Sequence, residues 1–110
     1  MSIDSIFEEI RRERRRQNEK WGEQNHPMLN VPFTVEGMRE RAIVYKALND
    51  SSDNNWFGIL QEEVYEAFAE TEPEKQREEM IQVGALAVQI IEYLDRRMSD
   101  AEKQAANTTP

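Results

Sequence analysis

The feature that most limits how this chain can fold is an apolar run, MIQVGALAVQII, from Met80 to Ile91. Gln82 and Gln89 are its only polar side chains. A helix formed by this run is apolar nearly all the way round, so it has to be buried on most of its sides. It would lie at the centre of a helical bundle or at a subunit interface. We therefore expect an all-α, antiparallel four-helix bundle-like domain that is completed by dimerisation.

Periodicity and helix-breaking residues predict four helices and almost no strand. Apolar residues recur at helical spacing in each predicted helix, and Gly and Pro interrupt the segment between the first two. The expected helices span about residues 4–20, 35–48, 56–70 and 74–98. Thr34 is the expected N-cap of the second helix, and Pro73 suits the first turn of the fourth. Residues 1–100 are expected to form a single domain and residues 101–110 a flexible polar tail.

The composition limits the classes of function. The chain has 110 residues, which is enough for one domain and too few for two. It contains no cysteine, which excludes disulfides and thiolate metal sites. Its formal net charge of −8 makes direct nucleic-acid binding a poor expectation. The N-terminus lacks an apolar signal segment and no run approaches the length of a membrane span, so we expect a cytoplasmic protein without membrane association.

The segment WFGILQEEVYEAFAE, residues 56–70, places glutamates on an apolar helix face. On a helical wheel Glu63 falls in the middle of the apolar set, so its side chain is expected to face the interior. Glu66 falls at the boundary of that set, and Glu62 points outward to solvent. The fourth helix repeats the anomaly, because Glu79 shares a stripe with three apolar residues.

Carboxylates on an interior face have to be paired, neutralised or bound to a metal. No Lys or Arg lies on the same stripe of either helix, and three inward acids on adjacent helices repel one another and raise one another's pKa. A divalent cation removes both costs, and oxygen-only ligands select hard ions such as Mg²⁺ or Mn²⁺. The alternative is a solvated acidic face, because Glu-rich helices are common and a Glu near a helix start interacts favourably with the helix dipole.

Two separate motifs, in the expected order, resemble a known family. EEVYE (residues 62–66) followed by EEMIQV (residues 78–83) resembles the EExxE … ExxD signature of MazG-like nucleoside triphosphate pyrophosphohydrolases, members of the all-α NTP pyrophosphatase superfamily. The stretch ERRRQNEKWGEQNHP (residues 13–27) looks like the corresponding part of small MazG-like proteins. The resemblance covers about residues 6–97, which is most of the chain.

The resemblance implies a Mg²⁺ site on two antiparallel helices, with Mn²⁺ as a substitute ion. Glu63, Glu66 and Glu79 match three metal ligands of the family, and Gln82 stands where the fourth ligand is normally Asp. A glutamine offers a carbonyl oxygen without charge, so we expect weaker metal binding or a different number of ions. Glu62 matches the additional acid of the motif. Either Glu62 or Glu66 is a candidate to orient or deprotonate the attacking water.

Four residues are candidates for binding a nucleotide. In related proteins aromatic and histidine residues ahead of the acidic helix enclose the base and sugar, which implies such roles for Trp21, Trp56 and His26. Arg14, in the basic segment RRERRR, could meet the charge of the triphosphate. The alternatives are a core position for Trp56, a loop-stabilising role for His26 and a solvated or salt-bridged role for Arg14.

The reaction that the resemblance implies is hydrolysis of a ribo- or deoxynucleoside triphosphate between its α and β phosphates, which gives a monophosphate and pyrophosphate. Such an enzyme would clear non-canonical or surplus nucleotides, and we expect it to be a homodimer or homotetramer. The alternative is a degenerate relative that binds a nucleotide, or only dimerises, without hydrolysis. Gln82 is the residue that favours this alternative.

Overall fold

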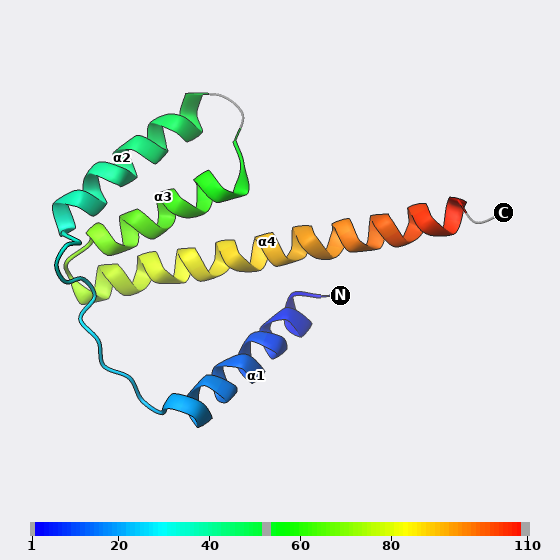
Figure 1. Cartoon of the computed structure of the whole chain (residues 1–110), viewed down its shortest axis with the longest axis horizontal. Helices are drawn as coiled ribbons and strands as arrows, with labels where there is room; N and C mark the ends of the chain where they lie inside the picture. The colour runs from blue at the N-terminus through cyan, green and yellow to red at the C-terminus, as the bar shows by residue number, and fades with distance from the viewer. Residues whose placement is uncertain (1, 52–53, 109–110) are drawn as a thin grey trace. The chain divides into compact units, whose positions relative to one another are not determined.

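The computed structural model describes residues 2–51 and 54–108, and four α-helices account for most of them (Figure 1). The helices are α1 (Ile3–Trp21), α2 (Val35–Ser51), α3 (Trp56–Ala69) and α4 (Pro73–Thr108). No β-strand occurs in these ranges, so the predicted all-α class is confirmed. The closed bundle and the dimer stay predictions. Across the same ranges, no helix combines the length and the apolar character that crossing a membrane requires.

The helix starts follow local capping chemistry. A capping box at Ser2 opens α1. Thr34 Oγ1 accepts a 3.0 Å hydrogen bond from the backbone N–H of Gly37, which confirms the predicted N-cap of α2. Asn55 caps α3 in the same way and accepts a 2.7 Å hydrogen bond from the N–H of Gly58. Each cap binds an N–H group that has no partner inside its helix.

The fourth helix ends later than predicted. α4 continues to Thr108, whereas the sequence prediction ended this helix at Met98 and assigned residues 101–110 to a flexible polar tail. That prediction of the helix end was wrong because it relied on polarity. Residues 99–107 contain no Gly or Pro and are rich in Ala, Glu, Lys and Gln, which are strong helix formers. Residues 109–110 lie outside the described part of the chain.

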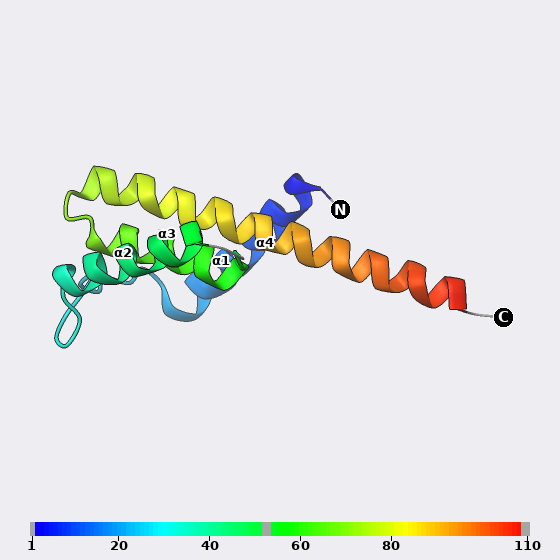
Figure 2. The ribbon, with the colours of Figure 1, turned by 90° about the horizontal axis from the view of Figure 1, so that it is seen from above.

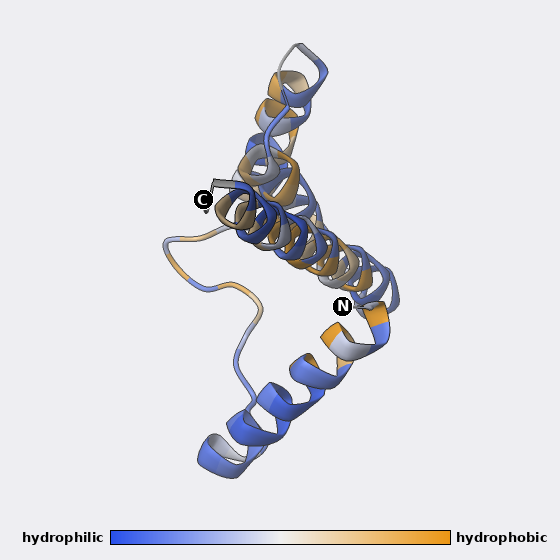
Figure 3. Cartoon of the chain, turned by 90° about the vertical axis from the view of Figure 1, so that its right-hand side faces the viewer, coloured by the Kyte–Doolittle hydropathy of each residue, from blue (hydrophilic) through white to orange (hydrophobic). Residues whose placement is uncertain are grey.

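The chain divides into two compact units, and the first is made of Met1–Asn25 and Val88–Pro110. It contains α1 and the second part of α4. Its most buried residues are Ile6, which is 2% exposed, and Val88, which is 5% exposed. Apolar colour is confined to the early turns of α1, and the later turns are mostly hydrophilic (Figure 3). The apolar side chains of α1 therefore lie near the start of the helix.

The second unit, His26–Ala87, contains α2, α3 and the first part of α4. Here α2 and α3 run antiparallel, side by side (Figures 1 and 2). Ala67 of α3 is fully buried, and Ala42 of α2 and Gly58 of α3 are buried as well. Small residues of this kind let two helix backbones approach closely. This unit carries all the acidic residues that the sequence singled out.

The apolar segment of α4 is only partly buried in the single chain. Leu86 and Val88 are buried, whereas Ile81 is 60% exposed. Residues of the second unit therefore leave Ile81 largely uncovered, although a helix of this composition favours burial on most sides. A subunit interface, which the sequence suggests for this segment, therefore remains a physical explanation of its apolar character.

Candidate metal centre

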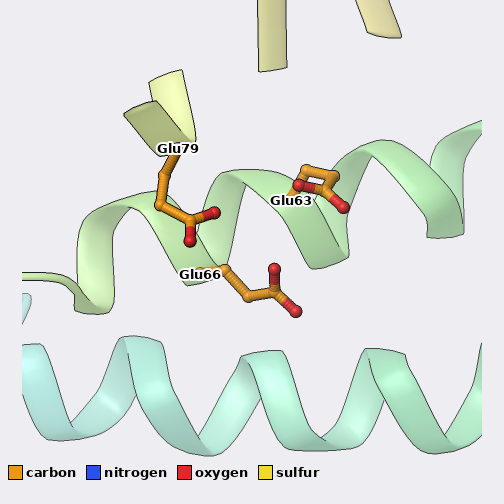
Figure 4. Close-up of side chains that lie close together, drawn as sticks. All are labelled: Glu63, Glu66 and Glu79. Carbon is orange, nitrogen blue, oxygen red and sulfur yellow. The ribbon is translucent and has the colours of Figure 1, made fainter. Parts of the chain in front are cut away.

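Three glutamates from two helices meet in the second unit. Glu63 and Glu66 lie one turn apart on α3, Glu79 comes from α4, and their carboxylates gather in one place (Figure 4). One carboxylate oxygen from each residue lies within 4.8 Å of those of the other two. All three residues are half-buried. The structure therefore brings together the three residues that the sequence proposed as metal ligands.

Local hydrogen bonds fix where α4 returns along α3. The side chain of Glu70 accepts hydrogen bonds of 3.0 and 3.2 Å from two backbone N–H groups of the short loop that follows α3. Gln76, in the first turns of α4, donates a 3.1 Å hydrogen bond to the backbone carbonyl of Ala67. These contacts tie the start of α4 to the end of α3. Glu79, one turn after Gln76, is thereby held beside Glu66.

Two carboxylate oxygens of the cluster are buried without a partner. Glu63 Oε2 and Glu79 Oε2 accept no hydrogen bond from any residue that the structure describes. Among the residues that the structure describes, the salt bridges are exposed pairs, and none of them includes a member of the cluster. A buried acceptor without a partner is costly, and more so when it is charged. The cluster is therefore unfavourable unless a proton or a cation occupies it.

Burial and mutual repulsion raise the pKa of two of these glutamates. The pKa of Glu66 is raised to about 7, first by desolvation and then by the charge of Glu63, with smaller contributions from Glu62 and Glu79. The pKa of Glu63 is raised as well, by desolvation and then by the charges of Glu79 and Glu62. Acids with perturbed pKa values in a shared site are typical of functional centres.

The donor set fits a hard divalent cation. Its three carboxylates supply only oxygen atoms, which Mg²⁺ and Mn²⁺ prefer. With Mg–O distances of about 2.1 Å, neighbouring ligand atoms of Mg²⁺ are about 3.0 Å apart and opposite ones about 4.2 Å apart. The three carboxylate oxygens lie within 4.8 Å of one another, so their side chains have to draw closer together to bind one ion. The unpartnered oxygens of Glu63 and Glu79 are available for this purpose.

Glu62 does not point out to solvent, and that prediction was wrong. Its side chain is half-buried, and Glu62 Oε1 accepts a 2.8 Å hydrogen bond from Asn49 Nδ2 of α2. The same nitrogen donates a 3.1 Å hydrogen bond to the backbone carbonyl of Gly58. When Glu66 is protonated it can donate a hydrogen bond to Glu62, and this contributes to the raised pKa of Glu66. A helical wheel of α3 alone misses this, because the face that carries Glu62 is covered by another helix.

We expect Asn49→Ala to lower the free energy of unfolding by about 1–3 kcal/mol, because it leaves a half-buried carboxylate of Glu62 without its donor. Urea denaturation measures this change. Asn54→Ala is the control, since Asn54 is exposed in the loop before α3, and its effect should stay within about 0.5 kcal/mol. An equally small effect of Asn49→Ala would show that this contact does not stabilise the α2–α3 pair.

Gln82 differs from the three glutamates in its exposure. It lies on α4 one turn after Glu79, and its side chain is exposed, whereas each of the three glutamates is half-buried. The three carboxylates therefore come together without it, and its role as a fourth ligand stays a prediction.

The four predicted nucleotide-binding residues lie in different parts of the chain. Trp56 begins α3 and is half-buried, and His26 is exposed in the loop between α1 and α2; both belong to the second unit. Trp21 and Arg14 belong to the first unit. Trp21 is 52% exposed, with the ammonium group of Lys20 4.8 Å from its ring centre, and Arg14 is exposed on α1. Their roles in substrate binding stay predictions.

Sequence reasoning missed two basic residues next to the cluster. A cavity of about 290 Å³ is lined by Glu66 and by Arg39 and Lys46 of α2. Arg39 and Lys46 are seven residues apart, so they share one face of their helix. That spacing is visible in the sequence. It identifies a site only when Glu66 is known to lie against the same face.

Comparison with known proteins does not assign this chain to a family. No family model, curated protein or solved structure matches the chain. The functional interpretation therefore depends on the glutamate cluster, on its electrostatics and on the two sequence motifs.

Proposed function

We propose that this protein is a Mg²⁺-dependent nucleoside triphosphate pyrophosphohydrolase that cleaves its substrate between the α and β phosphates. The observation that carries the proposal is the meeting of Glu63, Glu66 and Glu79, with two buried oxygens that lack a partner. The resemblance of EEVYE and EEMIQV to the MazG-like signature supplies the reaction and the substrate class. Its task would be to remove non-canonical or surplus nucleotides.

The residues of the cluster suit both metal binding and proton transfer. When bound, the ion supplies Lewis-acid stabilisation of charge on the phosphates. Glu62, which Asn49 holds beside Glu66, would orient or deprotonate the attacking water. Glu66, four residues after Glu62 on α3, is the other candidate for this task. The proposed ligands are Glu63, Glu66, Glu79 and Gln82.

The test is an endpoint assay in which a panel of ribo- and deoxynucleoside triphosphates is incubated with Mg²⁺ and then with Mn²⁺. The products are resolved as monophosphate, diphosphate, pyrophosphate and phosphate. Monophosphate plus pyrophosphate, formed by the wild type and lost in Glu63→Gln, supports the proposal and names the substrate. No turnover of any nucleotide with either ion would contradict it.

The alternative is a relative that binds a nucleotide or only dimerises. Gln82 supports this alternative, because a neutral amide leaves the site one negative charge short of the family pattern. The two proposals differ in hydrolysis and agree on the metal cluster, so the endpoint assay separates them.

Gln82→Asp is expected to strengthen Mg²⁺ binding by on the order of tenfold, because it adds a charged ligand to three existing carboxylates. Isothermal titration calorimetry measures the affinity. Gln89→Asp is the matched control, since Gln89 is another exposed glutamine of α4, and its affinity should equal that of the wild type. Equal affinities in all three proteins would contradict the four-ligand site.

We also propose that the protein associates with itself as a homodimer or homotetramer. Val44 and Leu48, four residues apart on α2, are each more than half exposed, as is Ile81 of α4. Monomeric proteins rarely leave large apolar side chains together on the surface, and a second copy would cover them. Light scattering after gel filtration measures the mass in solution, and the monomer value of 13.0 kDa would contradict this proposal.

A further inference from the structure

The cavity beside Glu66 is lined by both apolar and polar residues. It measures about 290 Å³ and is lined by residues of α2, of α3 and of the loop that follows α3. Its polar lining residues are Arg39, Lys46, Glu66, Glu70 and Thr71. All of them belong to the second unit, which also holds the glutamate cluster. The cavity therefore opens directly next to one of the proposed metal ligands.

The volume of the cavity indicates what it can hold. Sites for complete small molecules measure about 300–1,000 Å³, and this cavity is at the small end of that range. It can hold one part of a nucleoside triphosphate. The charge of its lining shows which part.

The positive charges of Arg39 and Lys46 face two carboxylates in the cavity, Glu66 and Glu70. Glu70 already accepts hydrogen bonds of 3.0 and 3.2 Å from the backbone N–H groups of Thr71 and Glu72. Glu66 is a proposed metal ligand, so a bound cation offsets its charge. Glu70 keeps its negative charge, but the positive charges of Arg39 and Lys46 then outnumber it by one, which favours an anion.

Lys46 lies close enough to the glutamates to interact with them. Its ammonium group interacts electrostatically with Glu62 and Glu66, and both interactions raise its pKa after the larger effect of Asp50. The Lys46–Asp50 pair, at 3.2 Å, is exposed, with 64% and 68% of the two side chains accessible. Exposed pairs of this kind are weak. Lys46 can therefore leave Asp50 for a more highly charged anion.

We propose that Arg39, Lys46 and Thr71 bind the polyphosphate chain of the substrate next to Glu66. This inference rests on the proposed function and adds the residues that hold the phosphates. Arg39 can donate two parallel hydrogen bonds to a phosphate, Lys46 supplies a point charge, and Thr71 supplies a hydroxyl donor. None of these groups reads a base, so binding at this site depends on the phosphates.

The test is binding of inorganic tripolyphosphate to the full chain, measured by isothermal titration calorimetry with free Mg²⁺ held constant and in excess. We expect the wild type to bind, and Arg39→Gln and Lys46→Gln each to weaken binding by roughly tenfold, because each removes a charge-assisted contact. Both residues are exposed, so folding should be unchanged. Orthophosphate should bind more weakly than tripolyphosphate to the wild type.

Arg77→Gln is the matched control. Arg77 is an exposed arginine of the same unit, and it lies two positions before Glu79 and hence on nearly the opposite face of α4. It removes the same charge without touching the cavity, so it should change tripolyphosphate affinity by less than about twofold. A tenfold loss in this variant would indicate a general charge effect and would overturn the proposed phosphate site.

Mn²⁺ binding, measured on the same proteins by electron paramagnetic resonance without tripolyphosphate, separates the two proposals. Suppose that the wild type binds Mn²⁺ and Glu63→Gln does not. Unchanged tripolyphosphate affinity in Arg39→Gln and Lys46→Gln, or no binding by the wild type, then overturns the phosphate site alone. If the wild type does not bind Mn²⁺, the proposed function fails and the phosphate site fails with it.

Discussion

Replacing Glu63 with glutamine is expected to weaken Mg²⁺ and Mn²⁺ binding by at least about tenfold and to reduce hydrolysis by at least about a hundredfold. Glutamine has nearly the shape of glutamate but no charge. The packing of α3 should therefore persist while the cluster loses one of its three carboxylates. Calorimetry measures the affinity, and the endpoint assay for monophosphate and pyrophosphate measures the rate.

The same Glu63→Gln substitution is expected to stabilise the metal-free protein by on the order of 1 kcal/mol. Glu63 carries a buried oxygen without a partner, and the charges of Glu62 and Glu79 act against its ionisation. The neutral amide removes this repulsion. A variant that loses function and gains stability identifies a residue kept for binding, because a residue kept for packing would lose both.

Glu78→Gln is the matched control for this experiment. Glu78 is the exposed neighbour of Glu79 on α4, and replacing it removes the same charge from the same unit without touching the cluster. Its metal affinity, its rate and its stability should all stay close to those of the wild type. If Glu63→Gln behaves like Glu78→Gln in the metal titration, the assignment of Glu63 as a ligand is wrong.

Helical periodicity alone predicts much of this molecule. A helix fixes the relative directions of its side chains, so the interior direction of Glu63 and the stripe that carries Glu79 can be derived before any contact between α3 and α4 is known. The helix starts are equally local, since Thr34 caps α2 through an atom three residues away. The raised pKa values of Glu63 and Glu66 follow from the burial of these acids and then from their mutual repulsion.

Properties that depend on a second helix are not predictable in this way. Periodicity places Glu62 in solvent because the helical wheel of α3 contains no information about Asn49, which reaches Glu62 from α2. Arg39 and Lys46 gain a role only from the cavity that Glu66 helps to line. The prediction of the end of α4 is wrong for a different reason. A polar segment can be an exposed helix as well as a tail, and helix propensity decides between them.

The pH dependence of the metal-free protein is the second large expected effect. The pKa of Glu66 is raised from 4.5 to about 7, so between these values the folded protein binds more protons than the unfolded chain does. Its stability should therefore fall as pH rises through this window and become level above it. We expect a loss of about 1 kcal/mol between pH 5 and pH 8, since the partial exposure of Glu66 to solvent reduces the full effect of the shift.

Urea denaturation at a series of pH values measures this slope. Glu63→Gln should reduce it, because the charge of Glu63 is the second-largest cause of the raised pKa of Glu66. A stability that is constant or rises between pH 5 and pH 8 in the wild type would contradict the raised pKa values of the cluster.

Metal binding should show the opposite dependence on pH. An ion at the cluster has to displace the proton of Glu66, so its apparent affinity increases as that proton is lost. With a pKa of about 7, roughly nine in ten Glu66 carboxyls are protonated at pH 6 and one in ten at pH 8, which predicts about a tenfold rise in Mn²⁺ affinity over this range.

Calorimetry in two buffers of different ionisation enthalpy counts the released protons. If Mn²⁺ binds with the same affinity at pH 6 and pH 8 and releases no proton, Glu66 is not a ligand. Both effects depend mainly on the proton of Glu66, so both should be smaller in Glu66→Gln, where the raised pKa of Glu63 remains.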